Sequence, residues 1–239
     1  MYKRILLKLS GEALRDDQHL LTIDVNHLEK LSRVIKSMHD NGTQIAIVIG
    51  AGNIWRGKLA DKIGIEPVPA DFMGMLGTVI NAVAMASNLK KRGVETVVYS
   101  AVPAIEGVTE PYSQERAHAS LNEGKVVFLA GGTGKPFFTT DTAAALRAVE
   151  LNCQAILMGK NGVDGIYTGD PTKDSSAEFI KTITFDEIIK RNLQVMDISA
   201  VELIKNTDID VRVFSMSEPQ NFLKVANGED IGTTVKKGE

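Results

Sequence analysis

The stretch KVVFLAGGTGKPFFTTDTAAALRAVELN, residues 125–152, predicts the fold of the chain. Its first seven residues, 125–131, predict a strand, and the apolar run within them is typical of a strand covered on both faces. Glycines follow and predict a turn, and Thr139, Thr140 and Asp141 are capping residues for a helix expected over 142–150. A strand, a turn and a helix in this order form the repeating unit of an α/β fold with a largely parallel sheet.

The same alternation continues along the chain. Further strands are predicted at residues 4–9, 44–50, 96–101, 154–159 and 211–216. Helices are predicted from the candidate N-cap Asp24 to the candidate stop Asn41-Gly42, over 113–124, and over an uncharged stretch at 72–89. We therefore predict an α/β fold with one central, mainly parallel sheet. No repeat or linker divides the chain, so one domain over residues 1–239 is expected, with the part after about Asn152 as a second lobe.

Composition limits the classes of partner. The chain has 239 residues, a net charge of −3 and a pI near 5.9, so it has no general attraction to nucleic acid or to an anionic membrane. Its lone cysteine, Cys153, is expected in a buried strand. The stretch 72–89 approaches the length of a membrane span, but its polar residues favour a helix buried in a core or at a subunit interface. With no visible signal peptide, we expect a soluble cytoplasmic protein without nucleic-acid or membrane partners.

Gly134-Lys135 resembles part of the phosphate-binding P-loop, but the neighbouring residues exclude that motif. The motif requires a glycine five residues before Gly134 and a Ser or Thr after Lys135. Leu129 and Pro136 occupy those positions, and proline offers neither a hydroxyl for Mg²⁺ nor an N–H for phosphate. The stretch therefore binds phosphate in another way, binds a different group, or is a plain strand-to-helix turn.

Ligands of open parallel sheets bind at the carboxyl ends of the strands, so the residues after each strand are the candidates. Lys8, Ser10 and Gly11 follow the first strand, where they either hold phosphate oxygens or place an ordinary lysine on the surface. After the second strand, Gly52 allows a ligand to approach the backbone, and Arg56 is suited to a phosphate.

Two acids and an aromatic residue extend this set. Asp71 precedes the uncharged helix and is either its N-cap or an acceptor for the hydroxyls of a ribose. Asp141 lies at a helix N-terminus, which attracts phosphate, and an acid there suggests a role in placing a metal or substrate. Tyr167 is a candidate for stacking on a base. Residues 163–167 also fit a surface hairpin with an Asp-Gly type I′ turn, and such a hairpin can carry the ligand.

Glycine turns, cations and two acids at one edge of a sheet are the groups that phosphoryl transfer requires. His19, His27, His39 and His118 are scattered along the sequence and form no metal motif, and the hydrolase motif G-x-S-x-G is absent from the sequence.

Five stretches in this order resemble the bacterial uridylate kinase family, within the amino-acid kinase superfamily. They are KLSGEAL (8–14), IGAGNIWRG (49–57), DFMGML (71–76), GTGKPFFTTDTAA (132–144) and VDGIYTGDP (163–171). The resemblance runs from about Tyr2 to Thr234 and implies a three-layer α/β sandwich. It implies transfer of the ATP γ-phosphate to UMP, giving UDP and ADP in pyrimidine nucleotide biosynthesis. It also implies Mg²⁺ bound with ATP, with no metal site of the protein's own, and an allosterically regulated homo-oligomer that is typically a hexamer.

The resemblance assigns functional residues by position. The ATP-binding set is Lys8, Leu9, Ser10, Gly11, Gly52, Arg56, Asn161, Tyr167 and Asp170, and the UMP-binding set is Ala51, Asp71, Thr133, Gly134, Lys135, Pro136, Phe137, Phe138, Thr139 and Thr140. The catalytic set is Lys8, which bridges the transferring group, Asp141, which positions it, and Asp164, which is expected to organise Lys8. Residues 1–152 are expected to bind mainly UMP and the phosphates, and residues 153–239 mainly ATP.

Two departures from the family bear on function. Gly50-Ala51-Gly52 stands where many relatives carry three glycines, and alanine is small enough to keep a backbone contact. Residues 15–24 lack the glycine that is typical of relatives regulated by GTP, which argues against GTP as the activator.

Three other functions fit parts of the sequence. A kinase for a carboxylate or carbamate acceptor would need a clamp of cations and no ribose ligand, which Asp71 disfavours. A nucleotide-sensing module without catalysis would be expected to lack Lys8 or Asp141. A dinucleotide-binding oxidoreductase would need G-x-G-x-x-G after the first strand, where SGEAL stands.

Overall fold

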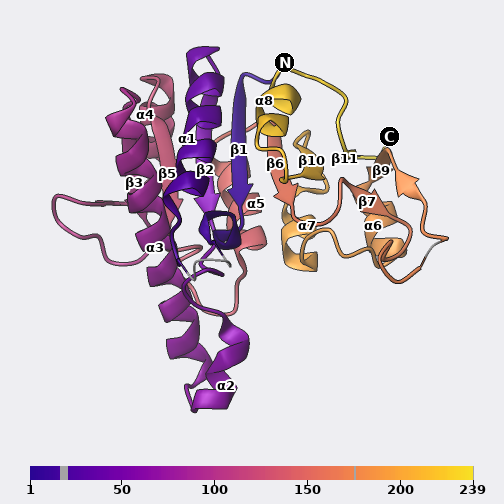
Figure 1. Ribbon diagram of the computed structural model, residues 1–239, viewed down its shortest axis with the longest axis horizontal. Coiled ribbons are helices and arrows are strands. Elements are labelled where there is room, and N and C mark those ends of the chain that lie inside the picture. The colour runs from indigo at the N-terminus through magenta and orange to yellow at the C-terminus, as the bar shows by residue number, and fades with distance from the viewer. Residues whose placement is uncertain (17–20, 175, 239) are drawn as a thin grey trace.

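The computed structural model describes residues 1–16, 21–174 and 176–238, and its centre is a nine-stranded sheet (Figure 1). In order across the sheet the strands are β4 (Glu110–Pro111), β3 (Thr96–Ser100), β5 (Val126–Ala130), β2 (Gln44–Ile49), β1 (Arg4–Leu9), β6 (Ala155–Lys160), β10 (Asp210–Ser215), β11 (Thr233–Lys236) and β9 (Thr182–Thr184). Neighbouring strands are parallel except β10 and β11. The predicted α/β fold with a central, mainly parallel sheet is confirmed.

Helices cover both faces of the sheet, which is the middle of three layers. One face packs against α1 (Val25–Asp40), α3 (Pro67–Lys91) and α8 (Gln220–Ala226) in a shared apolar core. The other face packs against α4 (Gln114–Asn122), α5 (Thr140–Glu150), α6 (Phe185–Lys190) and α7 (Ile198–Ile204). Neighbouring residues of one strand pack into the cores on opposite faces of the sheet, as Ile5 and Leu6 do, because side chains alternate across a strand.

The strands predicted from apolar runs are buried on both faces. All five residues of β5 are buried, and so are the first five of β6. Cys153, just before β6, is also buried as expected, and burial raises the pKa of its thiol to about 12. The thiol therefore stays protonated and packs as a small apolar group.

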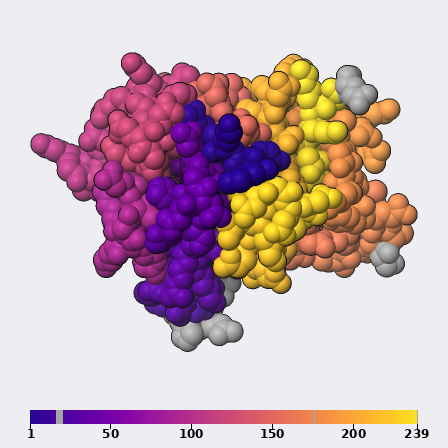
Figure 2. Space-filling view, turned by 90° about the horizontal axis from the view of Figure 1, so that it is seen from above, coloured from indigo at the N-terminus to yellow at the C-terminus, as the bar shows by residue number. Residues whose placement is uncertain are grey.

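The N-terminal residues pack against the end of helix α8. The backbone N–H of Tyr2 donates to the carbonyl oxygen of Ala226 at 3.0 Å, and Figure 2 shows the N-terminal residues against the C-terminal ones. β1 pairs with both β2 and β6, so residues on either side of Asn152 contribute to one sheet.

Two local predictions are wrong. α3 begins at Pro67 with Glu66 as its N-cap, so Asp71 lies inside the helix and is not its cap. Proline at the start of the helix explains this, because its fixed φ suits the first turn. Residues 163–167 form no hairpin of their own, because Ile166–Tyr167 is strand β7 and pairs with β8 (Phe179–Ile180) further along the chain.

In the described parts of the chain, α3 is the one helix that is long and apolar enough to span a membrane. Half of the most apolar 18-residue stretch of α3 is buried inside the fold. There the helix packs against α1, β3 and β5. Its outward side is also apolar, and the exposed residues there are Val68, Phe72, Met73, Leu76 and Ile80. Four of them recur every fourth position and form a stripe along the helix. We call these five residues the α3 stripe.

Candidate active site

Lys8 and Asp141 form an ion pair at the edge where the central strands end. Lys8 is the next-to-last residue of β1, and its Nζ lies 2.6 Å from Oδ1 of Asp141 in the first turn of α5. The side chains are 18% and 21% exposed, so the alternative of an ordinary surface lysine at Lys8 is wrong. A pair that is partly shielded from water yet still reachable can act strongly on an incoming phosphate.

Lys160, the last residue of β6, adds a second cation that the sequence interpretation missed. Its Nζ donates to the carbonyl oxygens of Val195 at 2.9 Å and Gln194 at 3.3 Å. Burial lowers the pKa of Lys160, and the nearby positive charge of Lys8 lowers it further, while Asp141 opposes both effects. The three side chains are therefore electrostatically coupled. In the sequence, a lysine before Asn161-Gly162 suggests a solvated turn. The pairing of β6 with β1 is what brings Lys160 to the same edge of the sheet as Lys8.

The turns after β1 and β2 pack directly against each other. Oγ of Ser10 accepts a hydrogen bond from the N–H of Glu12 and caps the short helix η1 (Gly11–Leu14). A Cβ at Gly11 would lie 2.5 Å from the carbonyl oxygen of Gly50 and 2.8 Å from the N of Gly52. Glycine is therefore required for this contact, which brings two phosphate-binding candidates, Gly11 and Gly52, to one place.

Two buried amide side chains hold these turns, one from α3 and one from the loop after β2. Nδ2 of Asn81 donates to the carbonyl oxygen of Gly50 at 2.8 Å and to Oδ1 of Asn53 at 2.8 Å. Asn81 is fully buried and Asn53 nearly so, so both amides depend on these internal partners. The sequence suggested only that Asn81 dilutes an apolar helix, and the pairing of the two asparagines could not be predicted from it.

Arg56 faces the same turns from the side. Its Nη2 donates to Oε1 of Glu12 at 2.6 Å, and its Nε donates to the carbonyl oxygen of Gly52 at 3.2 Å. The guanidinium is about half exposed, so it remains accessible to a ligand while it is held beside Gly52.

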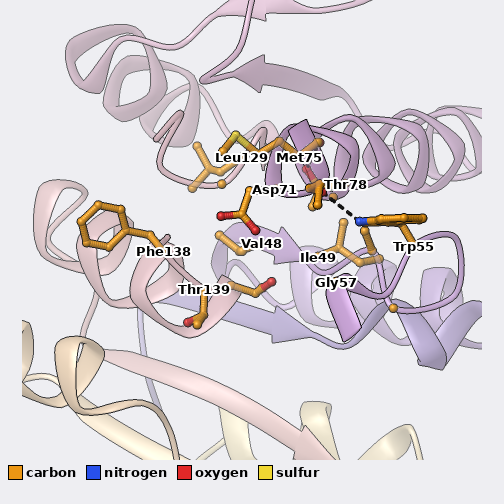
Figure 3. A pocket seen from close by; sticks show the side chains of 16 residues that line it. Val48, Ile49, Trp55, Gly57, Asp71, Met75, Thr78, Leu129, Phe138 and Thr139 are labelled. Carbon is orange, nitrogen blue, oxygen red and sulfur yellow. Dashed lines mark hydrogen bonds between the residues drawn. The ribbon is translucent and has the colours of Figure 1, made fainter. Parts of the chain in front are cut away.

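A cavity of about 290 Å³ opens beside these turns (Figure 3). It is lined by residues of β2 and the loop after it, of α3, and of the loop before α5 and its first residue, among them Ala51, Gly52, Trp55, Asp71, Met75, Thr78, Phe138, Thr139 and Thr140. Trp55 forms part of the wall and its Nε1 donates to the carbonyl oxygen of Ala70 at 2.8 Å. The cavity thus offers apolar walls and a few polar groups, as small-molecule sites do.

The loop before α5 is tied to the cavity through Asp71. The backbone N–H of Phe137 donates to Oδ2 of Asp71 at 2.6 Å. Of the predicted UMP-binding stretch, Phe138, Thr139 and Thr140 line the cavity, and the described residues 133–137 do not. Phe137 is 73% exposed and has a φ of 69°, a conformation that non-glycine residues adopt mainly at special sites.

A second cavity, of about 510 Å³, is lined in part by Lys160. Its lining includes Lys160, Tyr167, Asp170, Lys173 and Val195. Hydrogen bonds from Thr172 and the ion pair with Lys173 hold the pKa of Asp170 at about 2, so this carboxylate is ionised at neutral pH. Two of the three predicted adenosine contacts, Tyr167 and Asp170, line this same cavity.

Two predicted residues lie apart from their expected partners. Asp164 accepts a hydrogen bond from Oη of Tyr167 at 2.6 Å, so the acid beside Lys8 in this structure is Asp141. Asn161 lines a separate cavity of about 320 Å³ with Glu12 and Met216. Residues 17–20, within the stretch compared with GTP-regulated relatives, lie outside the described residues.

Asp197, at the start of α7, was also missed. Its carboxylate accepts hydrogen bonds from Oγ1 of Thr139 and, at 3.0 Å, from Oγ1 of Thr142. It also caps α7 by accepting from the N–H of Ala200. Asp197 therefore ties the start of α5, which carries Asp141, to the C-terminal part of the chain.

Comparison with known proteins assigns the chain to a family. Residues 3–215 match the model of the amino acid kinase family. The structure of a UMP kinase from Bacillus anthracis is 38% identical, with a TM-score of 0.95 over 100% of this chain and 97% of that one. A UMP kinase from Ureaplasma parvum is 34% identical, with a TM-score of 0.93 over 99% and 100% of the two chains. A uridylate kinase from Archaeoglobus fulgidus is 26% identical, with a TM-score of 0.74 over 97% and 99%. The chain belongs to the amino acid kinase family.

Proposed function

We propose that the chain is a UMP kinase, which transfers the γ-phosphate of ATP to UMP and releases UDP and ADP. The observation that carries this proposal is the 2.6 Å pair of Lys8 and Asp141 at the ends of β1 and α5. One cavity is lined by Thr140, which adjoins Asp141. The other is lined by Lys160, whose charge is coupled to the pair. Two nucleotides bound in these cavities would direct their phosphates toward the same cations.

UMP is assigned to the cavity of about 290 Å³. The carboxylate of Asp71 would accept hydrogen bonds from the ribose hydroxyls. The loop of residues 133–140 and the backbone at Ala51 would surround the base and the α-phosphate. A carboxylate accepts hydrogen bonds from hydroxyl groups but offers no donor to an acidic acceptor, so Asp71 fits a ribose better than a second carboxylate.

ATP is assigned to the cavity of about 510 Å³, with Tyr167 and Asp170 beside the adenosine. Its phosphates would extend to the packed turns at Ser10, Gly11 and Gly52, where backbone N–H groups are available. On this assignment residues 1–152 bind mainly UMP and the phosphates, and residues 153–239 bind mainly ATP.

Mg²⁺ would enter with ATP. Among the described residues, no group of three or more His, Cys, Asp or Glu side chains is placed to hold a metal ion. Phosphate oxygens would supply most of the ligands, which suits Mg²⁺ because it prefers oxygen and retains water. The bound ion would neutralise part of the phosphate charge.

Transfer would proceed by in-line attack. An oxygen of the UMP α-phosphate forms a bond to the γ-phosphorus, and the bond to the β,γ-bridging oxygen breaks, so ADP leaves with the electron pair. The attacking oxygen is already anionic near neutral pH and needs no general base. Lys8 and Lys160 would neutralise the charge of the transferring group, and Asp141 would hold Lys8 in position.

Assembly and location follow from the same proposal. The α3 stripe exposes five apolar side chains on one helix, and burial against a second copy would remove them from water. We assign the enzyme to a cytoplasmic homo-oligomer, a hexamer under allosteric control, in pyrimidine nucleotide biosynthesis.

An ADP-release assay with several acceptors tests the function. ATP and Mg²⁺ are supplied with UMP, CMP, AMP, aspartate, glutamate or carbamate in parallel. ADP release with UMP is expected. Release only with an acidic acceptor would keep the phosphate site and overturn the assignment of UMP, and silence with all six from a folded protein would favour a nucleotide sensor.

A further inference from the structure

The glycine turn after β5 is held from two sides by buried side chains that have no part in the proposed chemistry. The N–H of Gly131 donates to Oγ1 of Thr78, on α3, at 2.8 Å. Nη2 of Arg147, on α5, donates to the carbonyl oxygen of Gly132 at 3.3 Å. Thr78 is 8% exposed and Arg147 is 5% exposed. The turn is therefore held by α3 on one face of the sheet and by α5 on the other.

The turn has a conformation that needs such support. Gly131 and Gly132 have φ angles of 76° and 59°, in the left-handed region that side chains disfavour. A Cβ at Gly131 would lie 2.9 Å from the backbone N of Val102. Gly132 itself lines the cavity assigned to UMP, so the shape of this turn sets the wall from which residues 133–140 depart.

Arg147 is itself held in one orientation. Its Nη1 lies 2.7 Å from Oε2 of Glu150, and its guanidinium lies 3.7 Å from the centre of the Tyr112 ring. Oη of Tyr112 donates to the same carboxylate oxygen of Glu150. Burial raises the pKa of Tyr112, so its phenol remains a donor. The guanidinium is thus held toward Gly132 by two contacts, with Glu150 and Tyr112, whose side chains are hydrogen-bonded to each other.

A buried guanidinium is costly unless its geometry is good and its donors are used. An apolar side chain of similar length would fill the same space without that cost. The retained charge therefore points to a specific task, and the contact with Gly132 is the one that reaches the cavity.

We infer that Arg147 is a positioning residue for the acceptor site. It acts through the carbonyl group of Gly132 and does not touch substrate. Because Arg147 and Asp141 lie on the same helix, α5 sets both the acceptor turn and the acid beside Lys8. This inference rests on the proposed assignment of UMP to the cavity.

Steady-state kinetics of Arg147→Met and Arg147→Lys test the role. Arg147→Met is expected to raise KM for UMP about tenfold and to change KM for ATP by less than about twofold, because one hydrogen bond of the acceptor wall is lost. Arg147→Lys keeps the charge and one donor and is expected to recover part of the loss.

Arg212→Met is the matched control. Arg212 is also a buried arginine, on β10, and its Nη2 donates to the carbonyl oxygens of Glu229 and Ile231 at 3.2 and 3.3 Å. This variant is expected to lower Tm without raising KM for UMP. Equal rises of KM for UMP in the two methionine variants, or equal changes of both KM values in Arg147→Met, would show a general structural role and overturn the inference.

Hydrogen exchange of the nucleotide-free protein gives a readout that does not depend on the reaction. The amides of Gly134 and Phe137 are expected to exchange faster in Arg147→Met than in wild type, at an intermediate rate in Arg147→Lys, and at the wild-type rate in Arg212→Met. Unchanged exchange in Arg147→Met would overturn the positioning role whatever the acceptor is. Absence of UMP turnover in wild type, with faster exchange in Arg147→Met, would overturn the proposed function and retain the role of Arg147.

Discussion

The backbone N–H of Phe137 donates a 2.6 Å hydrogen bond to Oδ2 of Asp71, which joins the loop before α5 to helix α3 across the cavity assigned to UMP. One carboxylate therefore has two tasks in the proposal. It holds the loop without a ligand, and it would receive the ribose hydroxyls when UMP binds.

Asp71→Ala is expected to raise KM for UMP at least tenfold, because a hydrogen bond to a charged group typically contributes about 1.5–3 kcal/mol. KM for ATP should change by less than about twofold, because Asp71 lines the cavity assigned to UMP and not the one assigned to ATP. Initial rates with each substrate varied in turn measure both. Glu66→Ala, which removes the acid at the N-cap of the same helix, is the control and should leave both constants near wild type. Equal rises in both constants would contradict the assignment of Asp71.

Sequence reasoning located most of this cavity but not the way in which it is held. The strands with apolar runs were predictable because burial on both faces leaves a strong pattern, as in Val126–Ala130. The uncharged helix after Asp71 was predictable, but α3 begins earlier, at Pro67, and already includes Asp71. Short elements such as β4 and β7 were not predicted, because two residues carry no periodicity and pair only in the tertiary structure.

The supporting residues were missed for a related reason. Asn81, Thr78 and Arg147 lie within helices, and their partners are backbone groups of loops distant in the sequence. A polar residue within a helix gives no indication of which loop it contacts. Lys160 and Asp197 were missed because each adjoins an ordinary turn or cap in the sequence, and only the sheet order brings them near Lys8 and Thr139.

Lys8→Ala is expected to fold normally and to lose turnover by about a hundredfold or more, since removal of one cation from a transferring phosphate commonly costs a few kcal/mol of barrier. The loss should appear in kcat with ATP and UMP both saturating. Lys3→Ala, at an exposed position just before the same strand, is the control for charge and should keep wild-type turnover. Near-normal kcat in a folded Lys8→Ala protein would exclude Lys8 from the transfer.

Lys160 predicts a specific pH dependence. Burial and the charge of Lys8 lower its pKa, so as pH rises the ammonium loses its proton before an ordinary lysine would. If its charge assists transfer, kcat should fall through that lowered pKa. Lys160→Arg stays charged and should extend activity to higher pH, whereas Lys160→Met should lower kcat throughout. An alkaline limb that is the same in wild type and Lys160→Arg would assign the limb to another group.

The α3 stripe predicts assembly. Leu76→Glu places a charge at an apolar position that is 55% exposed in the single chain, and it is expected to dissociate the oligomer because burial of an unpaired charge is costly. Sedimentation velocity measures the mass. Ile198→Glu, on α7 and 66% exposed, adds the same charge to an exposed apolar position elsewhere and should leave the mass unchanged. A monomeric wild-type protein, or a Leu76→Glu variant of unchanged mass, would contradict assembly through this face.

The central claim is that the pair of Lys8 and Asp141 serves transfer from ATP to UMP. Phosphorus NMR of a mixture of enzyme, Mg²⁺, ATP and UMP follows every phosphorus atom directly. The account predicts that ADP and UDP appear in equal amounts, with no inorganic phosphate, and that Lys8→Ala slows both equally. Formation of ADP with inorganic phosphate while UMP remains unchanged would contradict it.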